Sequence, residues 1–118
     1  MRMITGILNL ICFALLLLKY PARIYHWDEL NDRLQLLHKT ISGLVCLTIG
    51  LHIGTILPYI GKVPADVPVL GGLIVIVYLL LVTLCHTMKD HEQKMHWHRI
   101  MSVCLLAVIV GHVVCAVI

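Results

Sequence analysis

HKTISGLVCLTIGLH, residues 38–52, and HRIMSVCLLAVIVGH, residues 98–112, are two apolar stretches of equal length that begin and end with histidine. An α-helix advances about 100° and 1.5 Å per residue. Fourteen residues therefore make almost four turns, so both histidines of a stretch lie on one stripe, about 21 Å apart along the axis. The pattern predicts two helices of membrane length with a histidine near each end.

The composition predicts an integral membrane protein. The chain has 118 residues, of which 60% are hydrophobic and 13% charged, and its mean hydropathy is +0.97. A soluble domain of this size cannot bury so much apolar surface. Four stretches are long enough, or nearly so, to cross about 30 Å of hydrocarbon as helices: residues 4–18, 40–60, 67–87 and 100–118. A cleaved signal peptide is the alternative for the first stretch, but no A-x-A-like site follows it before Tyr20.

We therefore expect an all-α protein, a single domain over residues 1–118 that forms an up-and-down bundle of four transmembrane helices. Pro21 is expected to end the first helix. Asp28 is expected to cap the second helix, which would begin before the membrane and run into it. Asp90 would cap the helix that leads into the last span.

The basic residues predict the topology. Seven of the nine lie beside the first and third connections, namely Lys19, Arg23, Arg33, Lys39, Lys89, Lys94 and Arg99. Arg2 and Lys62 lie on the opposite side. Because lysine and arginine accumulate in cytoplasmic loops, we expect these two connections in the cytoplasm and both termini outside it.

The two halves of the sequence are similar at a shift of 60 residues. This shift superposes histidines, basic residues and serines, namely His26 on His86, His38 on His98, His52 on His112, Lys39 on Arg99 and Ser42 on Ser102. The other positions match mainly in being apolar, as any two membrane helices would. Duplication of a helix pair and chance similarity of four helices both stay open.

The histidine spacing and the helix directions together predict haem sites. In an up-and-down bundle the second and fourth helices run parallel, so His38 lies at the depth of His98, and His52 at the depth of His112. Zinc or copper would need more than two ligands at each depth, and a helix–helix hydrogen bond explains one histidine better than two equal intervals. Two imidazoles suffice for a haem iron. We predict two non-covalent bis-histidine haems b between the second and fourth helices.

Residues near these histidines fit the same prediction. Lys39 and Arg99 directly follow the two cytoplasmic-side histidines, where they would pair with haem propionates, although flanking positive charge is the simpler explanation. Small residues would leave room for the macrocycle, although glycine is common in membrane helices: Gly43, Gly50, Gly54 and Gly111.

The remaining histidines and the cysteines have plainer interpretations. His96 is rotated by about 160° from the stripe of His112, so His98 is the predicted ligand. Four histidines are expected to be interfacial side chains beside Trp27 and Trp97, with a surface metal site or a proton-handling cluster as the alternative: His26, His86, His91 and His96. The five cysteines form no C-x-x-C pair and are expected to pack as small apolar residues: Cys12, Cys46, Cys85, Cys104 and Cys115.

The segments Leu37-His38-Lys39 to Leu51-His52-Ile53 and Trp97-His98-Arg99 to Gly111-His112-Val113 resemble the ferric-reductase-like transmembrane domain. They are also similar to the four-helix cytochrome b core of respiratory quinol–cytochrome c oxidoreductases. The resemblance covers about half of the chain and implies two bis-histidine b haems and transmembrane electron transfer. That reductase domain usually has six helices and often a flavin and nicotinamide module. This chain has four apolar stretches and no G-x-G-x-x-G fingerprint, so reduction of iron or oxygen is not implied.

The sequence thus predicts a dihaem b-type membrane cytochrome that serves as an electron-transfer subunit of a larger redox complex rather than as a self-sufficient enzyme. One alternative is a stand-alone quinol-linked oxidoreductase using Tyr59 or Tyr78, and another is a non-haem structural or metal-handling subunit. The expected partners are membrane lipid and either redox subunits or a quinol. A net charge of +3 does not suggest nucleic-acid binding.

Overall fold

The computed structural model describes residues 2–118, with side chains from Met3 onward. The described residues form five α-helices and one 3-10 helix: α1 (Arg2–Leu17), α2 (Lys19–Ile24), α3 (Asp28–Ile56), η1 (Leu57–Lys62), α4 (Asp66–Thr87) and α5 (His91–Val117). The all-helical prediction is confirmed. The predicted outer-face charge of Arg2 lies outside the described side chains.

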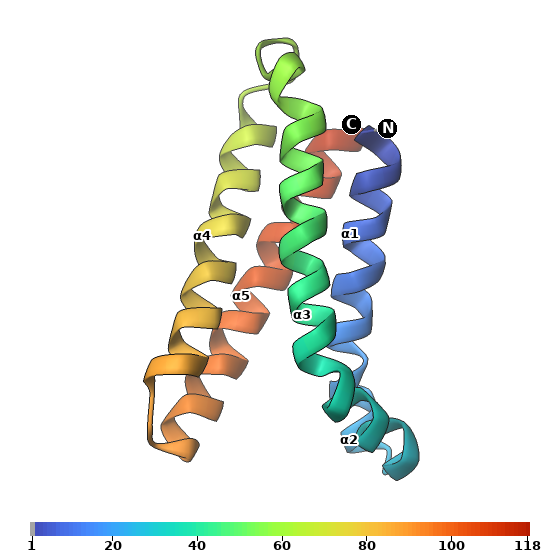
Figure 1. Cartoon of the computed structure of the whole chain (residues 1–118). Helices are drawn as coiled ribbons and strands as arrows, with labels where there is room; N and C mark the ends of the chain where they lie inside the picture. The colour runs from blue at the N-terminus through green and yellow to red at the C-terminus, as the bar shows by residue number, and fades with distance from the viewer. Residues whose placement is uncertain (1) are drawn as a thin grey trace. The chain divides into compact units, whose positions relative to one another are not determined.

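The chain divides into two compact units, Met1–Pro58 and Tyr59–Ile118. Each is a helical hairpin: α1 and α2 pack against α3 in the first, and α4 packs against α5 in the second (Figure 1). We call them the first and the second hairpin. Their assembly into one four-helix bundle stays a prediction.

Four helical segments are long and apolar enough to cross a membrane: Met3–Ile24, Asp28–Lys62, Asp66–Thr87 and His91–Val117. In the most apolar window of each segment, at most 17% of the residues are buried inside the protein. Monomeric soluble proteins rarely expose apolar surface on this scale. The helices are therefore consistent with an integral membrane protein, and the direction of the spans stays a prediction.

The first span departs from the expected end at Pro21. α1 ends at Leu17, and α2 begins two residues later and includes Pro21 in its first turn. Proline has no N–H to donate to the carbonyl four residues earlier, which is that of Leu17. The first turn of a helix needs no such donor, so α2 tolerates the ring. Pro21 interrupts the helix rather than ending it, and that prediction is wrong.

The two hairpins turn differently. In the first, His26 adopts a left-handed conformation with φ 56°, and the Trp27 N–H donates to the Ala22 carbonyl at 2.9 Å. This hydrogen bond and the left-handed residue are those of a Schellman helix end. In the second, the Asp90 carboxylate accepts from the Glu92 N–H at 3.1 Å, which confirms the predicted cap.

Asp28 is not the cap that the sequence predicted. Trp27 is the N-cap residue of α3 and Asp28 is the first helical residue, without a side-chain capping hydrogen bond. Its carboxylate still lies in the first turn, where a negative charge stabilises the helix through its interaction with the helix dipole. The predicted start of the second long helix near Asp28 is confirmed.

Each hairpin has a narrow buried seam at helical spacing. The buried residues of α3 are Leu34, Ile41, Val45 and Thr48, and those of α4 are Val67, Ile74, Tyr78 and Leu81, with the same intervals of seven, four and three. These intervals keep side chains on one face of a helix. His52 follows the buried Thr48 on α3, and His112 contacts the carbonyl of the buried Val67 of α4.

Candidate functional site

His52 is held by a chain of hydrogen bonds between α1 and α3. Its Nδ1 lies 3.0 Å from the Thr5 hydroxyl oxygen, and that oxygen lies 3.3 Å from the hydroxyl of Thr55. Thr55 in turn donates to the carbonyl of His52 at 2.8 Å. With the Thr55 proton placed there, all three contacts are satisfied when Thr5 donates to Thr55 and its oxygen accepts from the Nδ1–H of His52. This arrangement places the proton of His52 on Nδ1 and its lone pair on Nε2.

His112 has the same tautomer in the second hairpin. Its Nδ1 lies 3.0 Å from the carbonyl oxygen of Val67, at the start of α4. A carbonyl only accepts, so Nδ1 must be the protonated nitrogen. The lone pair again lies on Nε2, although the acceptor is now backbone rather than a side chain.

A glycine of the facing helix lies against each of these rings. A Cβ built on Gly6 would lie 3.3 Å from Cε1 and 3.7 Å from Nδ1 of His52. A Cβ built on Gly71 would lie 3.3 Å and 3.7 Å from the same two atoms of His112. The first distance is tighter than ordinary van der Waals contact. Both hairpins therefore seat a histidine ring in the same way.

His98 shows a third Nδ1–H arrangement, within α5. Its Nδ1 lies 3.2 Å from the Ser102 hydroxyl, which donates to the backbone carbonyl of His98 at 2.6 Å. The hydroxyl proton is thus used, and its oxygen accepts from Nδ1–H. Ser42 follows His38 at the same interval of four residues, and His38 is likewise half-buried. The repeat predicts the same tautomer for His38.

These settings suit metal-ligating histidines. A ligating histidine usually donates its second ring N–H to an oxygen, which fixes the tautomer and the ring orientation and makes the ligating nitrogen more basic. His52, His98 and His112 meet that requirement, each with Nε2 as the nitrogen that would bind. Residues that offer one imidazole each fit a haem iron, which takes two axial ligands.

A site of three or more protein ligands is not found in the described part of the chain. No group of His, Cys, Asp or Glu side chains there is placed to hold a metal ion in that way. The structure thus places no zinc-type cluster at the described surface histidines, the alternative left open for His26, His86, His91 and His96.

The two basic residues predicted to serve propionates are exposed. Lys39 and Arg99 each directly follow a half-buried histidine, His38 or His98, on a long helix. Their exposure is typical of long basic side chains, which keep the charged head in water. Pairing with propionates stays a prediction.

The other histidines are exposed, as expected of interfacial side chains: His26, His86, His91 and His96. The His96 ring lies edge-on to Trp97, with centroids 6.1 Å apart. His98, the predicted ligand, is half-buried.

The tyrosines of the quinol alternative differ in access. Tyr78 is buried in α4, whereas Tyr59 is nearly half exposed and has the Lys62 Nζ 5.8 Å from its ring centroid. Only Tyr59 therefore presents much of its surface to a ligand.

All five cysteines are free thiols. Cys12 and Cys115 are partly buried, but Cys46, Cys85 and Cys104 are exposed. The prediction that the cysteines pack as small apolar residues is not tested by this exposure. A thiol is apolar enough to face lipid.

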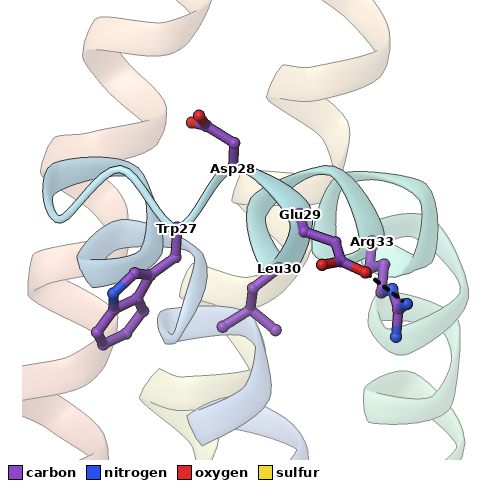
Figure 2. A pocket seen from close by; sticks show the side chains of 5 residues that line it. All are labelled: Trp27, Asp28, Glu29, Leu30 and Arg33. Atoms are coloured by element: carbon purple, nitrogen blue, oxygen red, sulfur yellow. Dashed lines mark hydrogen bonds and ion pairs between the residues drawn. The ribbon is translucent and has the colours of Figure 1, made fainter.

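A shallow pocket lies at the start of α3, away from the ligand candidates. Figure 2 shows its lining residues, Trp27, Asp28, Glu29, Leu30 and Arg33. Glu29 and Arg33 form an ion pair of 2.8 Å, with both side chains more than 70% exposed. Exposed pairs of this kind add little stability, and the pocket offers no buried polar group to a ligand.

Sequence reasoning missed the residues that seat the histidines: Thr5, Gly6, Val67 and Gly71. It selected glycines on the histidine helices instead, and an added Cβ would meet no histidine at any of these: Gly43, Gly50, Gly54 and Gly111. The position of each glycine along its helix could have identified them. In an antiparallel hairpin the start of one helix faces the end of the next, so Gly6 and Gly71 are the glycines expected near His52 and His112.

The chain matches no known protein family, and neither the curated proteins nor the solved structures include a match. The functional argument therefore rests on the chain's own residues.

Proposed function

We propose that this chain is a dihaem b-type membrane cytochrome whose axial ligands are His38, His52, His98 and His112. The observation that carries the proposal is the matched seat of His52 and His112. In each hairpin a facing glycine contacts the ring, and an oxygen of the facing helix accepts from Nδ1–H. Preparing Nε2 in this way is what ligation requires.

The pairing follows from the sequence. His38 and His52 are fourteen residues apart on α3, and His98 and His112 are fourteen residues apart on α5. On two parallel helices this equal spacing pairs His38 with His98 and His52 with His112. Each pair would hold the iron of one haem.

Bound at these ligands, haem iron would supply one-electron transfer across the membrane. The residues of the chain hold the ligands, and Lys39 and Arg99 would neutralise propionates at the cytoplasmic side. The seven basic residues beside the first and third connections support that orientation. The chain would work as a subunit of a larger redox complex, with partner subunits or a quinol as donor and acceptor.

Spectroscopy of the purified full chain tests the proposal. We expect reducible Soret and α bands and two haems per chain. His52→Ala and His112→Ala should each remove the same haem, so the double variant should keep the other one. His96→Ala is the matched control, because His96 is an exposed histidine of α5 outside the predicted pairs, and it should keep both haems.

Absence of haem bands in the wild-type chain would falsify the proposal. Loss of both haems in the double variant, with the helical circular dichroism intact, would contradict the independent pairs.

A further inference from the structure

The seats of His52 and His112 differ in one chemical respect. Directly before the facing glycine, the first hairpin has Thr5 where the second has Leu70. Three residues after the histidine, the first has Thr55 where the second has Cys115. The Nδ1 partner of His52 is therefore a side chain that can be changed, whereas His112 donates to a backbone carbonyl.

The hydrogen-bonded chain of hydroxyls begins at the ring of His52 and ends at the backbone carbonyl of the same residue. The contacts from Nδ1 of His52 to Thr5, from Thr5 to Thr55, and from Thr55 to the carbonyl of His52 measure 3.0, 3.3 and 2.8 Å. All three are satisfied when Nδ1–H donates to Thr5 and Thr5 donates to Thr55. All three residues are half-buried. In a chain of this kind each hydrogen bond polarises the next, so the Thr5 oxygen becomes a stronger acceptor. A stronger acceptor at Nδ1 makes Nε2 the better electron donor.

We propose that Thr5 is a positioning residue for His52, which with Thr55 fixes the Nδ1–H tautomer and strengthens Nε2 as a ligand. The part of this inference that concerns haem rests on the proposed function. The tautomer part concerns the chain alone and is tested without haem.

The first experiment measures the histidine tautomers by nitrogen NMR in the full haem-free chain, in detergent micelles. We expect His52 to be protonated at Nδ1 in the wild type. Thr5→Val should shift it toward the Nε2–H form, whereas Thr5→Ser, which keeps the hydroxyl, should not. His112 should be unchanged in both. An unchanged His52 tautomer in Thr5→Val would overturn the positioning role.

Thr55→Val provides a second variant if Thr5→Val does not fold. It removes the hydroxyl that lies 3.3 Å from the Thr5 hydroxyl but leaves Thr5 in place. A smaller shift of the His52 tautomer in the same direction is expected. No shift would show that Thr55 takes no part.

The second experiment compares the haem-loaded chains by potentiometric titration and haem release. Thr5→Val should raise the midpoint potential of the haem ligated by His52, because a weaker ligand stabilises ferric iron less. It should also weaken binding of that haem by about tenfold, the lower end for loss of a partner of a ligating histidine. Thr5→Ser should restore both values, and Leu70→Thr tests whether a hydroxyl grafted beside Gly71 affects His112.

The outcomes separate the two proposals. A wild-type chain that binds no haem ends the proposed function and leaves the tautomer result standing. A wild-type chain with two haems, of which neither responds to Thr5→Val, ends the ligand-strength inference and leaves the proposed function intact.

Discussion

The first and second hairpins seat a histidine with the same geometry but with different chemistry around it. Gly6 and Gly71 approach the same ring atoms of His52 and His112 at the same distances. Beside them the first hairpin uses threonine hydroxyls and the second a backbone carbonyl. Both histidines share the arrangement with the proton on Nδ1, but the acceptor differs. This is expected if the requirement is a free Nε2, which any acceptor at Nδ1 provides.

The interiors differ as well. In the first hairpin Asn9 and Thr48 are buried, with the Thr48 hydroxyl donating to the Asn9 carboxamide oxygen and the Asn9 amide donating to the Thr48 carbonyl at 3.3 Å. Asn9 stands three residues after Gly6, and the residue three after Gly71 is the buried Ile74. Inside a membrane, polar pairs and close apolar packing both hold helices together.

The shared register favours duplication of a helix pair. A shift of 60 residues aligns His52 with His112, whereas a shift of 65 aligns Gly6 with Gly71. The difference lies in the corner, which is longer in the first hairpin. With both shifts applied, buried Phe13 matches buried Tyr78, and buried Val45 matches buried Leu105. A single shift of 60 therefore left the first helices of the two pairs unmatched.

The largest expected effect comes from filling the glycine contacts. Gly6→Val and Gly71→Val should each displace a histidine ring, because even a Cβ would lie 3.3 Å from Cε1. Overpacking of this kind costs about 1–3 kcal/mol, and ligand sites tolerate displacements of only about 0.5 Å. We expect each variant to lose the same one of two haems, measured as the haem-to-protein ratio.

Gly72→Val is the matched control, because an added Cβ has no atom within 4 Å at that position and Gly72 is the neighbour of Gly71 on α4. It should keep both haems. Haem loss in Gly71→Val but not in Gly6→Val would break the equivalence of the hairpins.

The second prediction introduces the polar pair of the first hairpin, Asn9 and Thr48, at the matching positions of the second hairpin. Ile74→Asn should destabilise the second hairpin by about 1–3 kcal/mol, the cost of a buried polar group without a partner. Val108 stands four residues before His112, as Thr48 stands four before His52. Adding Val108→Thr should therefore recover about 1 kcal/mol. Equilibrium unfolding in mixed micelles measures both, and equal stability of the single and double variants would argue against the register.

Periodicity predicted the helices well and the histidine seats poorly. Apolar length located the four helical segments that are long and apolar enough to cross a membrane, and the carboxylate before His91 located the Asp90 cap, because both signals are local. The contacts of Gly6 and Thr5 with His52 form between two helices, and the number of residues in the connection decides which residues face each other. That connection was misjudged from the sequence at Pro21, since a proline at a helix start and one at a helix end look alike in sequence.

The third prediction compares the two helix starts. Asp90→Ala should destabilise the second hairpin by about 1 kcal/mol, as for other lost N-caps. Asp28→Ala removes no capping hydrogen bond, so it should cost only about 0.3–0.5 kcal/mol through the helix dipole. The same unfolding measurement applies, and the difference should persist at high salt, since screening weakens only the dipole term.

The smallest effect is expected at the corner of the first hairpin. His26 has φ 56°, a conformation that costs a non-glycine residue about 1–2 kcal/mol. His26→Gly removes that cost but gives the unfolded chain more freedom, worth about 0.5–1 kcal/mol. The two terms partly cancel, so stability should rise by about 0–1.5 kcal/mol. His26→Val should instead lower it, because a β-branched residue fits the left-handed region worst. His86 has no positive φ, so His86→Gly, within the last turn of α4, should lower stability where His26→Gly does not.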